Sequence, residues 1–435
     1  MSWFHIIPVL WFCLLGSPTW GQQSPTILPE PQSITVLDQE GMLMPGHLRA
    51  DAPQDLPWAE EHLKAFGQAL RVGYGQGLSF TSSESIDPPH LMVRVAKDLA
   101  PEAYRLALTD RIHVEIGGPK ALAHATATLL QLWGPMGSRL PAVRIQDAPA
   151  NPYRSLMVDL GRNPHSLTLM KETIDLLWFY KVDSLHLHLT DDQRFAFPSE
   201  AFPKLTSAET WTIEQFHALE AYAVARGVTL IPELESPGHG TLLRKHYPEV
   251  FGTNPTELAS LPSAREGLKT LLKEMMDVFQ STPYLHIGGD EAYGVPHHLQ
   301  HDLANDLHAF LKQHGRTAMV WEGPPLGEGS QKIDTDVIHF NWRTIDFPAD
   351  AMLAAGYPVI QASWDPLYVV DHYPRNNFTM AAPAHIYRTL SRGRFGHFNP
   401  HIPTFTDPIM LDSADPQILG YCMPWWEGRE TYFLP

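Results

Sequence analysis

From Tyr153 onward, short apolar runs of strand length alternate with longer segments in which apolar residues recur at helical spacing. A regular succession of strand and helix predicts a parallel sheet whose strands are joined by helices. Eight such strands indicate an α/β fold, the (β/α)8 TIM barrel. The predicted strands are Ser155–Leu160, Asp183–Leu189, Val228–Leu234, Tyr284–Ile287, Thr317–Trp321, Asp336–Trp342, Tyr357–Gln361 and Gln417–Met423. The predicted helices are Thr168–Tyr180, Ile213–Arg226, Ala264–Gln280, His298–His314 and Ala349–Ala355.

Two features of this pattern depart from a complete barrel. The stretch Asp365–Asp415 is rich in proline and shows no clear helical spacing, and only a short segment follows Glu427. We therefore expect the last barrel helix to be missing or replaced.

The chain before Tyr153 predicts a separate and smaller layer of strands and helices. The cluster Pro149-Ala150-Asn151-Pro152 is typical of a boundary, because proline interrupts both kinds of element. We predict a small α+β domain at residues 22–150, followed by the barrel domain at residues 151–435. The elements expected in the first domain are helices at Pro57–Val72 and Ala121–Trp133 and strands at Leu91–Val95, Tyr104–Thr109 and Arg111–Ile116.

The first residues of the chain form an apolar run, Ile6–Leu15, followed by Gly16, Ser17 and Pro18. The run is too short to span a bilayer and is typical of a secretory signal peptide, which we place at residues 1–21. The predicted location is therefore outside the cytoplasm, either periplasmic or secreted. Only one cysteine, Cys422, follows this segment, so no internal disulfide is expected in the mature chain.

Charge and composition narrow the range of partners. The formal net charge is −17, from 31 basic and 48 acidic residues, which argues against nucleic acid and anionic membranes. The chain contains 12 tryptophans and 39 prolines; the first favour sugar-binding surfaces, and the second favour long, shaped loops. These features suit a protein that acts on a neutral substrate.

Two adjacent carboxylates, Asp290 and Glu291, follow the apolar segment Tyr284–Ile287 and two glycines, Gly288 and Gly289. Neighbouring side chains on a strand point to opposite faces, so both can serve one site only where the strand has ended and the backbone turns. Repulsion between two such groups tends to raise one pKa, which is one way to make a general acid. The alternative is an acidic cap on the following helix.

The segment His286-Ile-Gly-Gly-Asp-Glu-Ala292 resembles the signature of glycoside hydrolase family 20, the β-N-acetylhexosaminidases. Other segments resemble that family's blocks and occur in the same order, over most of the chain from about Ile27 onward. These segments are Val158–Arg162, His186–Gln193, Ile231–His239, Trp321-Glu322 and Trp425-Trp426-Glu427.

The resemblance implies an exo-acting, retaining hydrolase that removes terminal β-linked N-acetylhexosamine from oligosaccharides or glycoconjugates, without a metal or other cofactor. In this family the nucleophile is the substrate's own acetamido group. By resemblance, Glu291 protonates the leaving oxygen and later activates water. Asp290 orients the acetamido group and stabilises the positive charge that develops.

The same resemblance assigns substrate-binding roles to residues of the other blocks. Arg162 would bind sugar hydroxyls, although an ion pair with Asp159 is the plainer interpretation of an arginine at this position. Asp191 and His239 would orient Glu291 and tune its pKa. Three tryptophans would line the pocket, Tyr368 would donate to the acetamido oxygen, and two carboxylates would accept from outer hydroxyls; the residues are Trp321, Trp342, Trp425, Asp371 and Glu427. Tyr368 and Asp371 are three residues apart, where the family more often has two, which puts at least one of these two roles in doubt.

Two other hypotheses remain open from the sequence. His186 and His188 share one face of a strand, as metal ligands of barrel amidohydrolases do, so a metal-dependent hydrolase is one alternative. A relative that binds sugar without turnover is the other. Metal dependence would identify the first, and absence of turnover would identify the second.

Overall fold

The computed structural model describes residues 25–51, 56–80, 89–134, 138–323, 332–344, 346–370, 383–396 and 407–426. Its internal contacts divide the chain into two units. The first holds the residues up to 150 together with 170–183 and 221–228, and the second holds 151–169, 184–220 and the residues from 229. The predicted signal peptide lies outside the described residues, so export stays a prediction.

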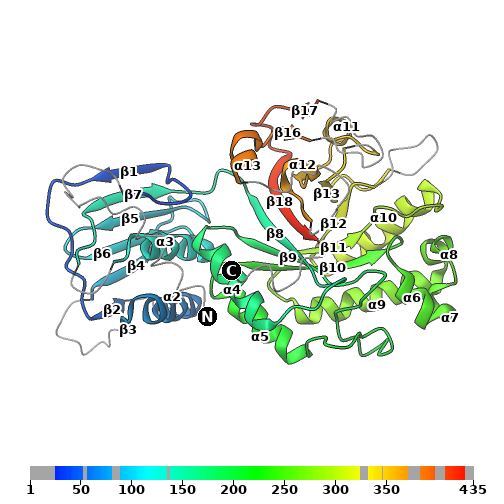
Figure 1. Cartoon of the computed structure of the whole chain (residues 1–435), viewed down its shortest axis with the longest axis horizontal. Coiled ribbons are helices and arrows are strands. Elements are labelled where there is room, and N and C mark those ends of the chain that lie inside the picture. The colour runs from blue at the N-terminus through cyan, green and yellow to red at the C-terminus, as the bar shows by residue number, and fades with distance from the viewer. Residues whose placement is uncertain are drawn as a thin grey trace. The chain divides into compact units, whose positions relative to one another are not determined.

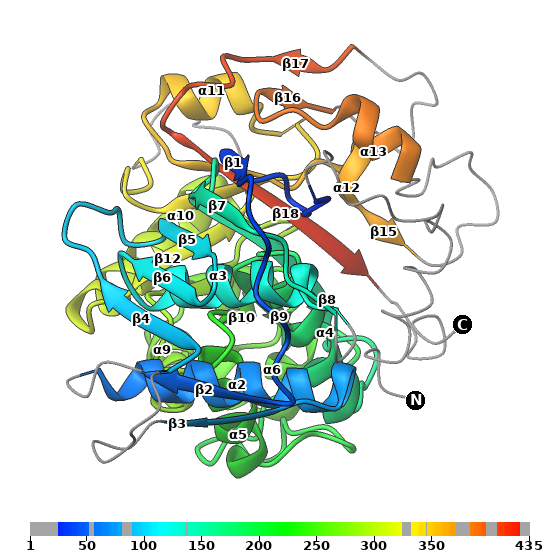
Figure 2. The same ribbon diagram turned by 90° about the vertical axis from the view of Figure 1, so that its left-hand side faces the viewer.

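The first unit contains a seven-stranded sheet and two helices that pack against it (Figure 1 and Figure 2). Buried and exposed side chains alternate along β5 and β6, as expected for strands with one covered face. The strand order is β1-β7-β5-β6-β4-β2-β3. The bounds are β1 Ser33–Val36, β2 His47–Asp51, β3 Gly77–Phe80, β4 Leu91–Val95, β5 Tyr104–Leu108, β6 Ile112–Ile116, β7 Val143–Asp147, α2 Pro57–Tyr74 and α3 Pro119–Leu132.

The second unit contains a closed barrel of eight parallel strands, in which β18 pairs with both β14 and β8. The predicted TIM barrel after a small α+β domain is thereby confirmed, and each of the eight predicted strands is present. The barrel strands are β8 Tyr153–Asp159, β9 Ser184–His188, β10 Thr229–Ser236, β11 Tyr284–Gly288, β12 Thr317–Trp321, β13 Ile338–Asn341, β14 Val359–Gln361 and β18 Ile418–Trp426.

The predicted helices of the barrel region also form, each within two residues of its predicted ends. The helices from Leu167 onward are α4 Leu167–Phe179, α5 Ile213–Val224, α6 Thr241–His246, α7 Pro248–Phe251, α8 Pro255–Ser260, α9 Pro262–Val278, α10 His297–Gln313, α11 Ala349–Ala354, α12 Trp364–Leu367 and α13 Pro383–Thr389. Three further short strands are β15 Val369–Val370, β16 Arg394–Phe395 and β17 Ile409–Met410. No helix among the described residues is long and apolar enough to cross a membrane.

Between Asp365 and Asp415, where the sequence shows no clear helical spacing, the structure contains the helix α13. This helix has seven residues and buries none of them, so it carries no apolar periodicity that the sequence could reveal.

Strand register brings polar side chains of four neighbouring barrel strands to one level. Asp159 pairs with His188, His188 pairs with Glu233, and Glu233 pairs with His286. Since parallel strands of a barrel carry their last residues to the same end, these side chains converge at the carboxyl end, where the barrel fold places its active sites.

Candidate active site

The backbone turns sharply after β11, where Asp290 and Glu291 lie. Gly288 and Gly289 have φ values of 74° and 110°, and Glu291 itself has a φ of 46°. A side chain at Gly288 is excluded by space as well, because an added Cβ would lie 2.2 Å from Oε2 of Glu235. The two glycines therefore allow the left-handed turn that places neighbouring carboxylates at one site.

Glu291 has different neighbours at its two carboxylate oxygens. Oε2 lies 3.4 Å from Nε2 of His239. Oε1 accepts a hydrogen bond of 2.8 Å from the hydroxyl of Tyr293 and lies 3.6 Å from Nη1 of Arg343. The hydrogen bond from His239 and that from Tyr293 lower the pKa of the Glu291 carboxyl, although burial acts in the opposite direction.

The pKa of Asp290 moves the other way. Burial, together with the negative charges of Glu291 and Glu233, raises it to about 7, and the positive charge of His239 opposes this rise. Repulsion within the pair thus raises one pKa, as the sequence argument expects, but the raised group is Asp290 in the free protein. The reason is that the donors of this region, His239 and Tyr293, are directed at Glu291.

These opposite shifts predict opposite effects of pH on stability. Asp290 has a folded-state pKa above its ordinary value of 3.8, so its contribution to stability is complete below about pH 4 and is lost as the pH rises through about 7. An asparagine side chain cannot ionise, so the variant Asp290→Asn should gain in Tm relative to the parent between about pH 4 and pH 8. Thermal denaturation of both proteins across this range measures the difference.

Glu291→Gln is the matched control. The folded-state pKa of Glu291 is lowered, so its contribution is present above its ordinary value of 4.5 and is lost as the pH falls. This variant should therefore lose Tm relative to the parent as the pH rises from about 3 to 6. The same pH trend in both variants would contradict the assignment of the raised pKa to Asp290.

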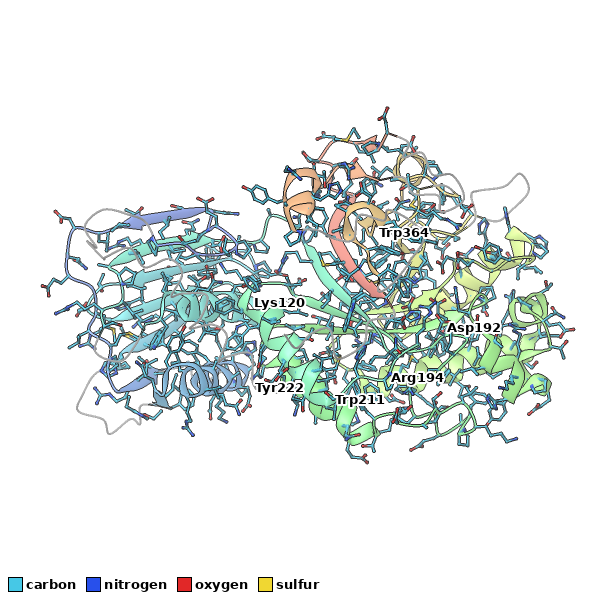
Figure 3. The ribbon with its side chains drawn as sticks, in the orientation of Figure 1. Lys120, Asp192, Arg194, Trp211, Tyr222 and Trp364 are labelled. Atoms are coloured by element: carbon cyan, nitrogen blue, oxygen red, sulfur yellow. The ribbon has the colours of Figure 1, made fainter. Side chains whose placement is uncertain are left out.

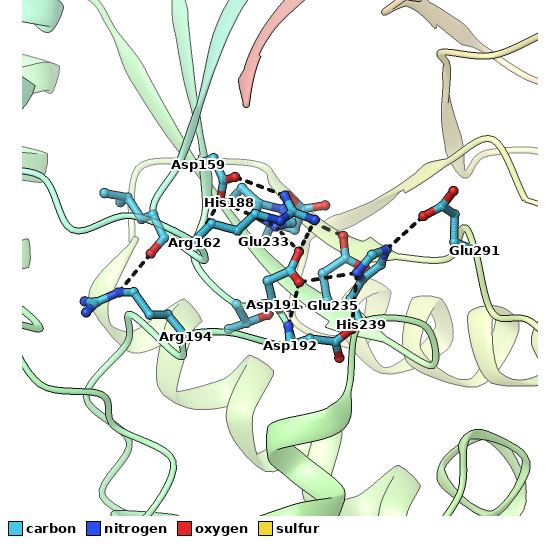
Figure 4. A network of polar contacts seen from close by, with 12 residues as sticks. Asp159, Arg162, His188, Asp191, Asp192, Arg194, Glu233, Glu235, His239 and Glu291 are labelled. Carbon is cyan, nitrogen blue, oxygen red and sulfur yellow. Dashed lines mark hydrogen bonds and ion pairs between the residues drawn. The ribbon is translucent and has the colours of Figure 1, made fainter. Parts of the chain in front are cut away.

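A chain of polar contacts leads from Glu291 into the barrel (Figure 4). Nδ1 of His239 lies 3.3 Å from Oδ1 of Asp191, and Oδ2 of Asp191 lies 3.1 Å from Nε2 of His188. Nδ1 of His188 is in turn 2.5 Å from Oε2 of Glu233. Burial alone would lower the pKa of His239, but its hydrogen bonds to Asp191 and Glu291 raise it to about 12, so His239 carries a proton next to Glu291 at neutral pH.

Glu233 lies fully buried inside the barrel and was given no role by the sequence. Its Oε1 accepts a hydrogen bond of 2.5 Å from the indole nitrogen of Trp321 and lies 2.8 Å from Nδ1 of His286. Its Oε2 lies 3.1 Å from Nε2 of His186 and contacts His188. Ligand atoms of His186, Glu233 and His286 lie close enough together to bind one metal ion. However, the carboxylate of Glu233 already contacts ring nitrogens of all three neighbouring histidines. His186 and His188, the two histidines that suggested a metal hydrolase, therefore both contact Glu233.

Arg162 is enclosed by acidic groups and one aromatic ring. Nη1 lies 3.0 Å from Oδ2 of Asp159, and Nη2 lies 2.6 Å from Oδ2 of Asp191. The guanidinium also stands 5.0 Å over the ring of Trp426. Asp159 is a partner of Arg162, as the plainer interpretation expects, but its carboxylate is buried, the arginine is half-buried, and Asp191 is a second buried partner.

Arg162→Ala should reduce stability strongly, because it leaves two buried carboxylates without their cation. Breaking a buried ion pair from one side costs about 3–5 kcal/mol. Arg194 provides the control, since its side chain donates to the backbone carbonyls of Leu160 and Ala208. Chemical denaturation should show a much smaller loss for Arg194→Ala; equal losses would contradict the pairing described here.

Aromatic rings stack beside the carboxylates. Tyr368 is buried and packs against Trp364, at 5.1 Å and 17°, and against Trp342, at 6.0 Å and 13°. Trp342 and Trp364 also lie 5.9 Å from each other. Trp364 is labelled in Figure 3, together with Asp192 from the loop after β9. Burial and the charge of Asp290 raise the pKa of Tyr368 well above its ordinary value, so its hydroxyl stays protonated and can donate. These rings form one wall beside Asp290.

The structure separates the two tryptophans at the end of β18. Trp425 stacks on His165 at 5.1 Å, whereas Trp426 approaches Trp321 at 5.7 Å and Tyr368 at 6.0 Å. Adjacent residues of a strand face opposite sides, so only one of the pair can face the barrel interior, and it is Trp426. Asp371 and Glu427 lie outside the described residues, and their roles stay predictions.

Comparisons with known proteins agree with this arrangement. The model of "Glycosyl hydrolase family 20, catalytic domain" matches residues 151–297, and that of "Glycosyl hydrolase family 20, domain 2" matches residues 24–148. A β-hexosaminidase of Akkermansia muciniphila is 33% identical over 227 residues, which are 45% of this chain and 46% of the relative. A β-hexosaminidase of Vibrio furnissii is 27% identical over 379 residues, which are 73% of this chain and 59% of the relative. The chain thus spans about half to three fifths of the length of these relatives.

Solved structures share the fold. The β-N-acetylhexosaminidase from Bacteroides fragilis NCTC 9343 superposes with a TM-score of 0.73 at 22% identity, covering 92% of this chain and 85% of that chain. A Streptomyces plicatus N-acetyl-β-hexosaminidase has the same TM-score at 20% identity, covering 93% of this chain and 87% of that chain.

Proposed function

Because the chain belongs to glycoside hydrolase family 20, we propose that it removes terminal β-linked N-acetylhexosamine from oligosaccharides or glycoconjugates, with retention of configuration. The observation that carries the proposal is the pair Asp290 and Glu291 at the carboxyl end of β11, with Tyr368 and Trp342 beside it. The named β-hexosaminidase relatives support the same substrate class.

In the first step, the acetamido oxygen of the substrate attacks the anomeric carbon as the bond to the leaving oxygen breaks. Asp290, ionised with substrate bound, accepts a hydrogen bond from the acetamido N–H. It also stabilises the positive charge on the oxazolinium-like ring that forms. Tyr368 donates to the acetamido oxygen and fixes its direction. Glu291 gives its proton to the leaving oxygen, so no alkoxide has to depart.

Glu291 must be protonated to act in this step. Its carboxyl is ionised in the free protein, so it has to take up a proton from solvent as the substrate binds. A bound substrate removes water from Glu291, which favours the neutral form of a carboxyl. His239, held through Asp191, keeps its own proton and orients Oε2 of Glu291.

In the second step, water attacks the anomeric carbon and gives a proton to Glu291, and the acetamido group is released. Two displacements on the same carbon retain its configuration. We expect the rings of Trp321, Trp342 and Tyr368, together with Trp426 and the Arg162 guanidinium over it, to surround a single sugar, which would favour action at chain ends.

The test is an assay of the whole chain on aryl β-N-acetylhexosaminides and on short β-linked N-acetylglucosamine oligomers, with and without chelator. We expect release of single N-acetylhexosamine units from one end, unchanged by chelator. Loss of activity with chelator and its return with metal would favour the metal hydrolase. Binding of the sugar without any turnover would favour the inactive relative.

A further inference from the structure

The two oxygens of Glu291 are not equivalent, which fixes the side from which a leaving group approaches. Oε2 faces His239, which is held in turn by Asp191. Oε1 faces the hydroxyl of Tyr293 and the guanidinium of Arg343. Because Tyr293 is exposed whereas His239 is largely buried, Oε1 is on the side of the carboxylate that is open to a leaving group. The residues beside Oε1 then lie next to the departing part of the substrate.

Tyr293 differs from the other aromatic residues of the site in being exposed. Its side chain is 72% exposed, whereas those of Trp321, Trp342 and Tyr368 are buried. Its position is nevertheless defined, because its N–H donates to the carbonyl of Glu291 at 2.7 Å and its hydroxyl donates to Oε1 at 2.8 Å. An exposed ring held at both ends offers a fixed apolar surface to a ligand.

The distances at Oε1 of Glu291 bring the ring of Tyr293 close to the leaving group. A general acid acts across about 2.6–3.2 Å, so the leaving oxygen comes within about 6 Å of the Tyr293 hydroxyl, which is bonded to the same carboxylate oxygen. The first ring attached to that oxygen then reaches the exposed ring of Tyr293.

Arg343 closes the other side of Oε1 and is itself held firmly. Its guanidinium pairs with Asp346 and stands 4.7 Å over the ring of Trp342. Its backbone N–H donates to Oε2 of Glu322 at 2.9 Å, and that buried carboxylate also accepts the N–H of Thr344 at 2.6 Å. The rim beside Glu291 is therefore preorganised on both sides.

We propose that Tyr293 forms the subsite for the leaving sugar: its exposed ring stacks on the first pyranose ring of the departing chain, while its hydroxyl keeps Oε1 of Glu291 directed at the bond that breaks. This inference rests on the proposed function. The ligand it selects is a neutral sugar ring, because a pyranose has an apolar C–H face that an aromatic ring can cover. The subsite favours oligosaccharides over glycosides with a small leaving group.

The test compares two substrates whose leaving groups both depart as alcohols and need a proton, a β-linked N-acetylglucosamine disaccharide and the methyl β-glycoside of N-acetylglucosamine. Tyr293→Ala should lower kcat/KM on the disaccharide about three- to tenfold more than on the methyl glycoside. Tyr293→Phe keeps the ring, so it should leave the ratio of the two values unchanged. It removes a donor from Glu291, which raises the pKa of this general acid, so the alkaline limb of the pH profile should move to higher pH.

Tyr387 provides the control, since it is 91% exposed on another element, α13, and Tyr387→Ala should change neither substrate. An equal loss on both substrates in Tyr293→Ala would overturn the stacking role, and an unshifted pH profile in Tyr293→Phe would overturn the role of the hydroxyl. A parent protein inactive on both substrates would instead contradict the proposed function.

Discussion

Glu291→Gln should lower the rate on substrates with a sugar leaving group by about 10²–10⁴-fold, the usual contribution of a general acid. The loss should be much smaller for a nitrophenyl leaving group, which departs as a stable anion without a proton. Steady-state kinetics on a series of leaving groups of decreasing basicity measures this dependence. Glutamine has the size of glutamate and can keep the contact with His239, so the substitution tests the proton rather than the packing.

A flat dependence on the leaving group would contradict the role of Glu291. If the variant lost the same factor on the sugar and the nitrophenyl substrates, the residue would be acting through charge or structure. Thermal denaturation of the same variant near neutral pH shows whether the loss reflects folding.

Asp290→Asn should lower the rate on all of these substrates by a similar factor, about 10²–10³-fold, as for loss of one group that stabilises charge in the transition state. Orientation of the acetamido group and stabilisation of its positive charge are needed whichever group departs. Parallel loss across the leaving-group series is therefore the signature of Asp290. The same slope in the Asp290 and Glu291 variants would show that the division of roles is wrong.

The fold could be predicted where apolar runs are long or periodic. β9, Ser184–His188, is buried at every position, so a continuous run marks it, and α9 presents an apolar face at helical spacing. β1 and β3 have four residues each, with no position fully buried, and left no pattern to detect. The predicted ends of the barrel strands are close to the observed ends because turns and motifs follow these strands directly.

The site was partly predictable for a related reason. Motifs at the carboxyl ends of barrel strands had to converge, so Asp191, His239 and Glu291 could be expected together. Which of the adjacent residues Trp425 and Trp426 faces inward depends on strand register, which the sequence does not specify.

Partners that come from distant loops were not predictable. Arg343 follows β13, yet it reaches the carboxylate that follows β11. Glu233 belongs to the segment Ile231–His239, but its carboxylate contacts both Trp321 and His188 only because the fold brings these residues together. The partners of Arg162 were also only partly predictable. The sequence predicted either a sugar contact or an ion pair with Asp159, but not the ion pair with Asp191.

In the proposed mechanism, the acetamido group of the substrate is the nucleophile, and Asp290 orients it. The most direct measurement compares two nitrophenyl β-glycosides that differ only in this group, N-acetylglucosaminide and glucoside. An intramolecular nucleophile held in position raises the reaction rate by several orders of magnitude. We therefore expect the glucoside to react more slowly by a factor on the order of 10³ or more. Comparable rates on the two substrates would contradict the claim, because the protein would then have to supply a nucleophile of its own.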